Sequence, residues 1–147
     1  MQDARFCGLK AALRSPLLHR YGLEKPTDGP DLRAAPSQAE TFVACRQLKA
    51  VAGWTDLGLG DFELRYLRDQ QKREVDFLIV RDHQPWFLIE VKLTDAGLSP
   101  SPAYFQAQTR AVHAFQVVLN LPYEPADCFK VHHPVVVPVK TFLSQLM

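Results

Sequence analysis

Three consecutive segments of the chain carry the patterns of β-strands. Apolar and polar residues alternate over residues 62–66, and two mostly apolar runs follow at residues 74–80 and 86–93. Short runs of this kind, bounded by polar turns, are typical of strands. Because the connections at residues 68–72 and 81–84 are short, we expect the three strands to form an antiparallel meander.

A helical pattern precedes these strands. Ser37 and Glu40 form the S-x-x-E pattern of a capping box, which predicts a helix over residues 38–52. Ala44 and Leu48 share one face of this helix, and Glu40 lies on the same face one turn earlier. Glu40 is therefore a carboxylate directed at the protein interior or its rim.

The remaining sequence predicts a second helix and two more strands. We expect a helix over residues 103–114, strands over residues 115–119 and 135–137, and a final helical turn over residues 141–147. The strand at 115–119 follows a helical crossover, so it should run parallel to a neighbouring strand. The order of elements predicts an α/β fold, in which helices flank a mixed sheet.

The first 36 residues differ from the rest of the chain. Leucines at helical spacing occur within residues 5–18, and residues 24–36 contain three prolines, a glycine and several charges. The second of these segments is typical of a surface loop. We expect residues 1–36 to be a short helix and loop, a remnant of a larger protein, and residues 37–147 to form the folded domain.

The composition is that of an ordinary globular domain. The chain has 147 residues, of which 47% are hydrophobic and 22% are charged, and this argues against a disordered chain. Lys and Arg number 17 and Asp and Glu 16, which gives a formal net charge of +1. So small a charge creates no overall field that attracts nucleic acid or a membrane, so a charged partner must meet a local patch.

Several classes of protein are disfavoured. No apolar run approaches the ~20 residues that a membrane span needs, and the first residues lack the layout of a signal peptide. We therefore expect a cytoplasmic protein without membrane contact. The three cysteines are odd in number and widely spaced, which argues against a disulfide framework and against a thiolate zinc site.

Three charged residues interrupt the two most apolar strands: Asp76 in one, and Glu90 and Lys92 in the next. A charge in a core strand is costly unless it is paired or coordinated. Strand alternation places Glu90 and Lys92 on one face. Asp76 lies opposite Glu90 only if the connecting hairpin has a three-residue loop at residues 82–84 or contains a bulge, because a regular two-residue hairpin would separate them.

If these faces coincide, two carboxylates and an ammonium group meet in one cluster. Oxygen ligands of this kind suit Mg²⁺ or Mn²⁺, which we expect as the cofactor. Such an ion generates hydroxide from water and stabilises charge on a phosphoryl group. We predict Asp76 and Glu90 as metal ligands and Glu40 as an auxiliary ligand. Lys92 would orient the nucleophile or stabilise the transition state.

The order Asp76, then Glu90-x-Lys92, resembles the D-x(n)-E-x-K signature of the PD-(D/E)xK phosphodiesterases. These enzymes have the restriction-endonuclease-like fold, whose core follows the order α-β-β-β-α-β. The resemblance implies Asp76, Glu90, Lys92 and Glu40 as the catalytic set, with DNA as the substrate. Val75 stands where the Pro of the motif name would be.

A longer resemblance covers most of residues 38–116. The stretches RYLRDQQKREVDFLIV and FLIEVK resemble the C-terminal domain of unknown function of a family of prokaryotic AAA-type ATPases. This resemblance implies an ATPase module as a partner, in cis or in trans. The chain itself has no G-x-x-x-x-G-K-[ST] motif, so we expect it to be a fragment, a truncated product or a stand-alone descendant.

Alternatives stay open at this point. Glu40 is explained equally well by its place in a capping box. Glu90 and Lys92 could form a simple ion pair. Gln106 and Gln108 occupy the helix on which similar nucleases place a helper residue, although they are more simply surface residues.

The chain could therefore be a non-catalytic domain that binds nucleic acid or protein for an ATPase, or a remnant with no function alone. The sequence does not give the oligomeric state.

Overall fold

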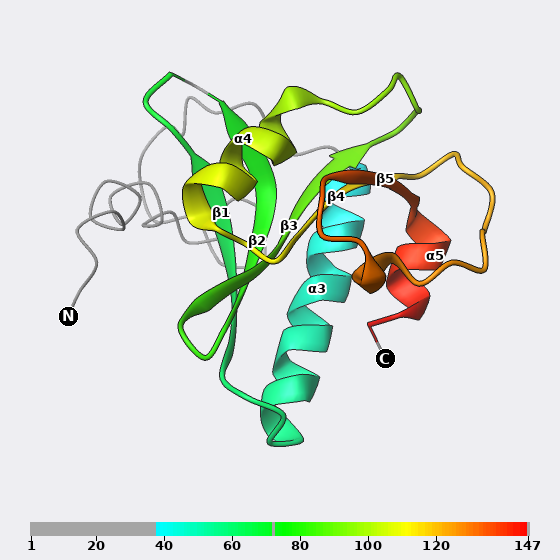
Figure 1. Cartoon of the computed structure of the whole chain (residues 1–147). Coiled ribbons are helices and arrows are strands. Elements are labelled where there is room, and N and C mark those ends of the chain that lie inside the picture. Colours follow the sequence, from blue (N-terminus) through cyan, green and yellow to red (C-terminus); the bar gives the residue numbers. More distant parts are fainter. Residues whose placement is uncertain (1–37, 72, 147) are drawn as a thin grey trace, which may run out of the picture.

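The structure, a computed structural model, describes residues 38–71 and 73–146 (Figure 1). The elements are, in chain order, α3 (Gln38–Asp56), β1 (Phe62–Arg68), β2 (Glu74–Arg81), β3 (Gln84–Lys92), α4 (Pro100–Thr109), β4 (His113–Val118), the 3₁₀ helix η2 (Cys128–Lys130), β5 (Val135–Pro138) and α5 (Val139–Ser144). This order confirms the expected α/β class. None of the described helices combines the length and the apolar character needed to cross a membrane.

The strands form one mixed sheet in the order β1-β2-β3-β4-β5. The first three pair antiparallel, which confirms the predicted meander. Strand β4 pairs parallel with β3, and β5 pairs parallel with β4. The parallel pairing of β4 confirms the crossover expected through the second helix, because a parallel neighbour cannot be reached by a tight turn.

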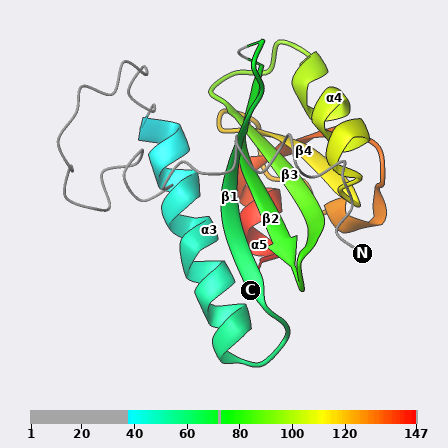
Figure 2. The same ribbon diagram turned by 90° about the vertical axis from the view of Figure 1, so that its left-hand side faces the viewer.

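Helices cover both faces of this sheet (Figure 2). Helices α3 and α5 pack on one face, where the larger core contains the fully buried aromatic residues Phe87, Phe115 and Phe142. Helix α4 packs on the other face through Phe105, against a smaller core that includes Leu78 and Leu88. The sheet is therefore buried on both sides, which explains why β2, β3 and β4 are mostly apolar.

Helix α3 extends beyond the predicted end at residue 52, to Asp56. Its buried residues include Val43, Ala44 and Val51, which recur at helical spacing and face the sheet. Ser37 of the predicted capping box lies outside the described residues, as does the whole of the predicted N-terminal helix and loop at residues 1–36.

Helix α4 differs from its predicted bounds of 103–114 at both ends. It begins at Pro100, because the Ser99 side chain caps it by accepting a hydrogen bond from the backbone N–H of Ser101, and proline suits the first helical position. It ends at Thr109, because Arg110 adopts a left-handed conformation with a φ of 59°. The prediction missed both signals, and β4 accordingly begins two residues earlier than expected.

Gln47 on α3 is a polar residue in an apolar core. It is fully buried, and neither atom of its side-chain amide has a hydrogen-bond partner. An unsatisfied buried amide costs about 1–3 kcal/mol. We therefore expect Gln47→Leu to raise the free energy of unfolding by about that amount, measured by urea denaturation.

The matched control is Gln145, whose amide donates hydrogen bonds to the carbonyl oxygens of Ala126 and Thr141. Gln145→Leu should lower the free energy of unfolding, because it leaves those acceptors without their donor. If both variants had a lower free energy of unfolding than the unchanged chain, the Gln47 amide would have hydrogen-bond partners in solution.

Candidate functional site

The turn between β2 and β3 has two residues, Asp82 and His83, because Arg81 pairs with Gln84. Both turn residues have positive φ, at 49° and 64°. Two-residue hairpin turns of this kind match the right-handed twist of the flanking strands. A regular hairpin after such a turn would have placed Asp76 and Glu90 on opposite faces.

A bulge directly after the turn restores the alignment. Val80 pairs with Pro85 but Ile79 pairs with Phe87, so Trp86 is the extra residue. Beyond the bulge the register runs on to the pair of Phe77 and Ile89. Asp76 and Glu90 are the next residues along the two strands, just beyond the last pair of this register. The sequence required either a three-residue loop or a bulge at this turn, and the structure has the bulge.

Asp76 is buried, with only 8% of it exposed. It lies at a register shift of β2 against β1, between the pairs Arg65–Leu78 and Leu67–Val75. Its Oδ2 atom accepts a hydrogen bond of 2.7 Å from the backbone N–H of Val91, the residue after Glu90. A charge-assisted bond of this length fixes the orientation of the carboxylate. Asp76 is thus held against β3 beside Glu90.

Glu90 is 7% exposed, and its two oxygens have different surroundings. Oε1 lies 3.1 Å from Lys92 Nζ and accepts a 3.2 Å hydrogen bond from the Ser99 hydroxyl. Oε2 is buried and has no hydrogen-bond partner. A buried carboxylate oxygen normally finds a donor or a cation, so this atom is the polar group of the site that the contacts within the described chain leave unsatisfied. The Lys92 side chain remains 45% exposed.

Gln116 on β4 belongs to the same site and was missed in the sequence. It pairs with Glu90 in the parallel register and is 1% exposed. Its Oε1 accepts a hydrogen bond of 2.7 Å from the Ser99 backbone N–H, and its Nε2 donates one of 2.8 Å to the Gly97 carbonyl. Gln116 therefore holds the loop that brings Ser99 to Glu90. The signal was a lone amide in the apolar strand HAFQVV.

The remaining candidates are Glu40, Gln106 and Gln108. Glu40 is half-buried in the first turn of α3, the helix that packs on the larger core. The Gln106 side chain donates to the backbone carbonyl of His132 at 2.8 Å, which is a structural role. Gln108 is exposed.

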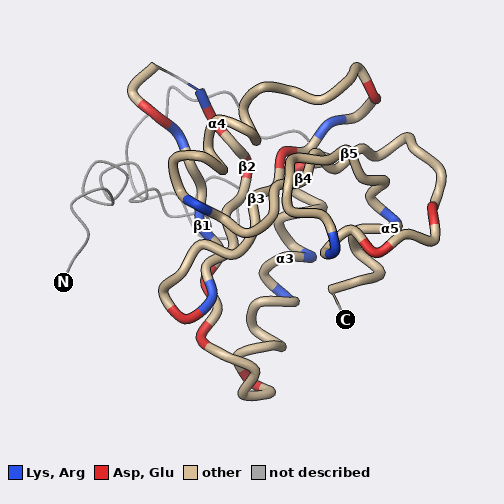
Figure 3. Tube along the Cα trace, in the orientation of Figure 1, with Lys and Arg blue, Asp and Glu red and all other residues tan. Residues whose placement is uncertain are grey.

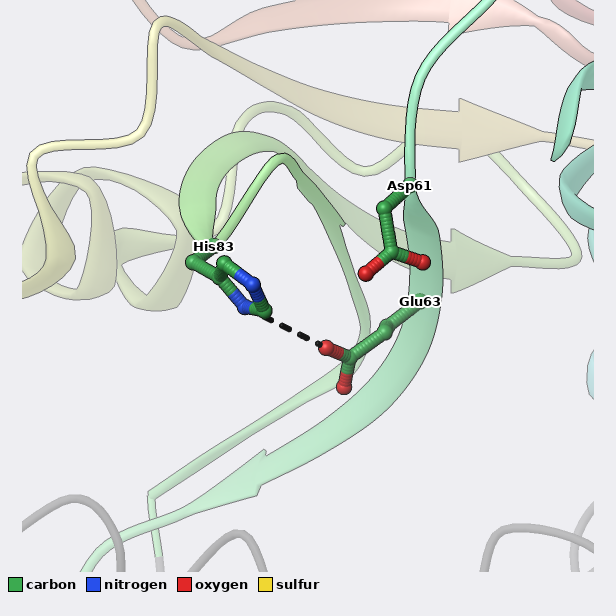
Figure 4. A group of neighbouring side chains, drawn as sticks. All are labelled: Asp61, Glu63 and His83. Carbon is green, nitrogen blue, oxygen red and sulfur yellow. Dashed lines mark ion pairs between the residues drawn. The ribbon is translucent and has the colours of Figure 1, made fainter. Parts of the chain in front are cut away.

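A second group of acidic residues lies at the opposite end of the β2–β3 hairpin (Figure 4). Asp61, Glu63 and His83 each offer one atom within 4.8 Å of the others, and among the described residues they are the set of three that does so. His83 Nδ1 lies 3.9 Å from Glu63 Oε1, and Glu63 also pairs with Arg65. Asp61 and His83 are exposed and Glu63 is half-buried, so water satisfies this group, unlike Glu90.

The architecture and the site together define a mixed α/β domain with two buried carboxylates, Asp76 and Glu90, on neighbouring strands. The chain belongs to the family described as "Domain of unknown function (DUF4143)", whose model matches residues 37–142. No curated protein and no solved structure matched the chain in the corresponding searches.

Proposed function

We propose that residues 37–147 form a metal-dependent phosphodiesterase domain of the PD-(D/E)xK type, with a restriction-endonuclease-like core and DNA as its substrate. The order of helix, antiparallel meander, crossover helix and parallel strand supports this assignment. The observation that carries it is the buried, unpartnered Oε2 atom of Glu90 on the strand next to the buried carboxylate of Asp76, which accepts a hydrogen bond from the N–H of Val91.

The residues present fit Mg²⁺ or Mn²⁺. Both ions prefer carboxylate oxygens and keep several water ligands, so two protein carboxylates are an adequate set. Asp76 and Glu90 would hold the ion, and Glu40 is proposed as an auxiliary ligand. When bound, such an ion supplies an activated water and stabilises charge on a phosphoryl group.

The remaining roles follow from the contacts of the chain. The exposed ammonium of Lys92 would stabilise negative charge on a phosphate that approaches Glu90 from solvent. Asp76 is kept in place by the Val91 N–H, and Glu90 by the Ser99 hydroxyl. These bonds hold the two carboxylates ready, so little reorganisation is needed when substrate arrives. We further propose that an ATPase module acts with this domain, in cis or in trans.

Calorimetric titration with Mn²⁺ tests the proposal without a choice of DNA substrate. We expect the full chain to bind one ion with micromolar to millimolar affinity, and Asp76→Asn to abolish that binding. Asparagine keeps an oxygen acceptor for the Val91 N–H, so the loss of charge is separated from the loss of fold. The matched control is Asp61→Asn, which should bind Mn²⁺ as the unchanged chain does.

Each other outcome has a definite meaning. Binding that survives Asp76→Asn but is lost in Asp61→Asn would place the ion at Asp61, Glu63 and His83 and refute the proposed site. Equal or absent binding in all three proteins would favour a non-catalytic domain that binds nucleic acid or protein for an ATPase.

A further inference from the structure

A cavity of about 410 Å³ lies between α3 and the C-terminal part of the chain, beside the larger core. Its lining includes Trp54 on α3 and Leu143 and Leu146 at the C-terminal end. The Trp54 indole N–H donates a 3.0 Å hydrogen bond to the Leu146 carbonyl, so the two walls are tied together. We call this depression the α3–α5 groove; Figure 1 shows the two helices on the same side of the sheet.

One face of α3, here called the α3 stripe, lines the cavity and has an exposed apolar residue toward each end. Phe42 is 46% exposed and Leu57, just past the helix end, is 75% exposed. Between them Arg46, Lys49 and Gly53 follow the same helix face at spacings of three or four residues. Fifteen helical steps span about 22 Å, which is longer than a small ligand and matches about four turns of another helix.

The charge on this stripe has one sign. Between Glu40 and Asp56, the charged residues of α3 are Arg46 and Lys49 (Figure 3). Both of them line the cavity. The Arg46 guanidinium lies 5.6 Å from the centre of the Phe42 ring. No acidic residue is among the described residues that line the cavity. The groove is therefore complementary to an acidic partner.

Gly53 leaves open space in the middle of the groove. A Cβ atom added there would meet nothing within 4 Å. Glycine in a helix interior costs about 1 kcal/mol relative to alanine, and packing within the described chain gives no reason for it. The vacant volume above Gly53 suits an apolar side chain from outside, which would rest on Trp54 and Leu143.

We propose that the α3–α5 groove binds an amphipathic helix of a partner protein, one that carries Asp or Glu beside its apolar positions. Apolar side chains at spacings of three and four residues would enter the groove, as in other helix-in-groove complexes. The carboxylates would pair with Arg46 and Lys49. This interaction uses none of the residues of the proposed metal site.

The test uses the full chain and two labelled helical peptides of about four turns. Both peptides carry Leu at spacings of three and four residues, and the flanking positions are Glu in one and Lys in the other. By fluorescence anisotropy we expect the Glu peptide to bind at least about tenfold more tightly than the Lys peptide, with an affinity that falls as salt is added.

Gly53→Leu is the blocking variant. A Cβ atom there meets nothing within 4 Å, so the fold should persist, while the leucine side chain should occupy the groove and abolish binding of the Glu peptide. Ala52→Leu, exposed on the same helix but off the stripe, is the control and should bind normally. The double change Arg46→Glu and Lys49→Glu should reverse the preference toward the Lys peptide.

Three results would overturn the proposal: no binding of either peptide at millimolar concentration, equal affinity for both peptides, or unchanged binding by Gly53→Leu. Concentration-dependent dimerisation that Gly53→Leu abolishes, seen by analytical ultracentrifugation, would assign the groove to a second copy of the chain instead. Mn²⁺ binding should be unaffected by all of these variants, so the two proposals fail separately.

Discussion

Replacing Glu90 by glutamine is expected to lower metal-dependent DNA cleavage by a factor of about 100 or more, without loss of stability. Removal of one positioned group that stabilises transition-state charge typically costs 10²–10³-fold in rate. The amide has the size of the carboxylate, but it carries no charge to hold a cation. Nicking of supercoiled plasmid in Mg²⁺ or Mn²⁺ measures the rate.

The stability of Glu90→Gln separates a functional residue from a structural one. Like charges close together on neighbouring strands destabilise a sheet, and Asp76 is bonded to the N–H of Val91, the residue after Glu90. The ion pair with the 45%-exposed Lys92 contributes little in return. The variant should therefore unfold at the same urea concentration as the unchanged chain, or at a higher one.

The control for this experiment is Glu63→Gln, which removes a half-buried carboxylate from the group at the other end of the hairpin. It should leave cleavage unchanged. Cleavage retained by Glu90→Gln, together with lower stability, would identify Glu90 as a structural partner of Lys92 and exclude it as a metal ligand.

The second large effect concerns the core. Phe87→Ala should lower the free energy of unfolding by about 3–5 kcal/mol, the usual range for a fully buried phenylalanine. Phe87 is 0% exposed, and its ring centre lies 4.8–6.0 Å from those of four other aromatic residues: Trp86, Phe115, Phe129 and Phe142. Since domains are stable by only about 5–15 kcal/mol, urea denaturation will register a large shift in midpoint.

Phe42→Ala is the matched control, because Phe42 is 46% exposed on α3. The same truncation there should change the free energy of unfolding by no more than about 0.5 kcal/mol. A loss at Phe87 as small as that at Phe42 would mean that the aromatic cluster is not packed as described.

The parts of the fold that the sequence predicted are those set by local pattern. The strand periodicity, the short turns and the position of the crossover helix were sufficient for the meander and for the parallel fourth strand. The charged residues Asp76 and Glu90 also led to the prediction of either a three-residue loop or a bulge at the turn, and the structure has the bulge. The position of the bulge at Trp86 could not be predicted from the sequence, because it depends on how a large aromatic ring packs against α3 residues such as Trp54.

Two features needed information beyond local pattern. The start of α4 is set by the Ser99 cap. The prolines around Ser99 are also typical of a loop, so the sequence pattern did not show that the helix begins there. Gln116 became recognisable only once β4 was placed parallel to β3, since the register brings it beside Glu90. Polar residues that serve a site through a neighbouring loop leave no periodic signal of their own in the sequence.

Strand β3 is the place where antiparallel and parallel pairing meet, and this has a consequence for the order of folding. Hairpins form in about 1–10 μs, whereas parallel pairing must wait for the closure of a longer crossover. Asp76 and Glu90 therefore come together with the β2–β3 hairpin, early in folding. Gln116 and the Ser99 loop join only when the parallel half of the sheet closes, so the carboxylate pair forms first and is enclosed later.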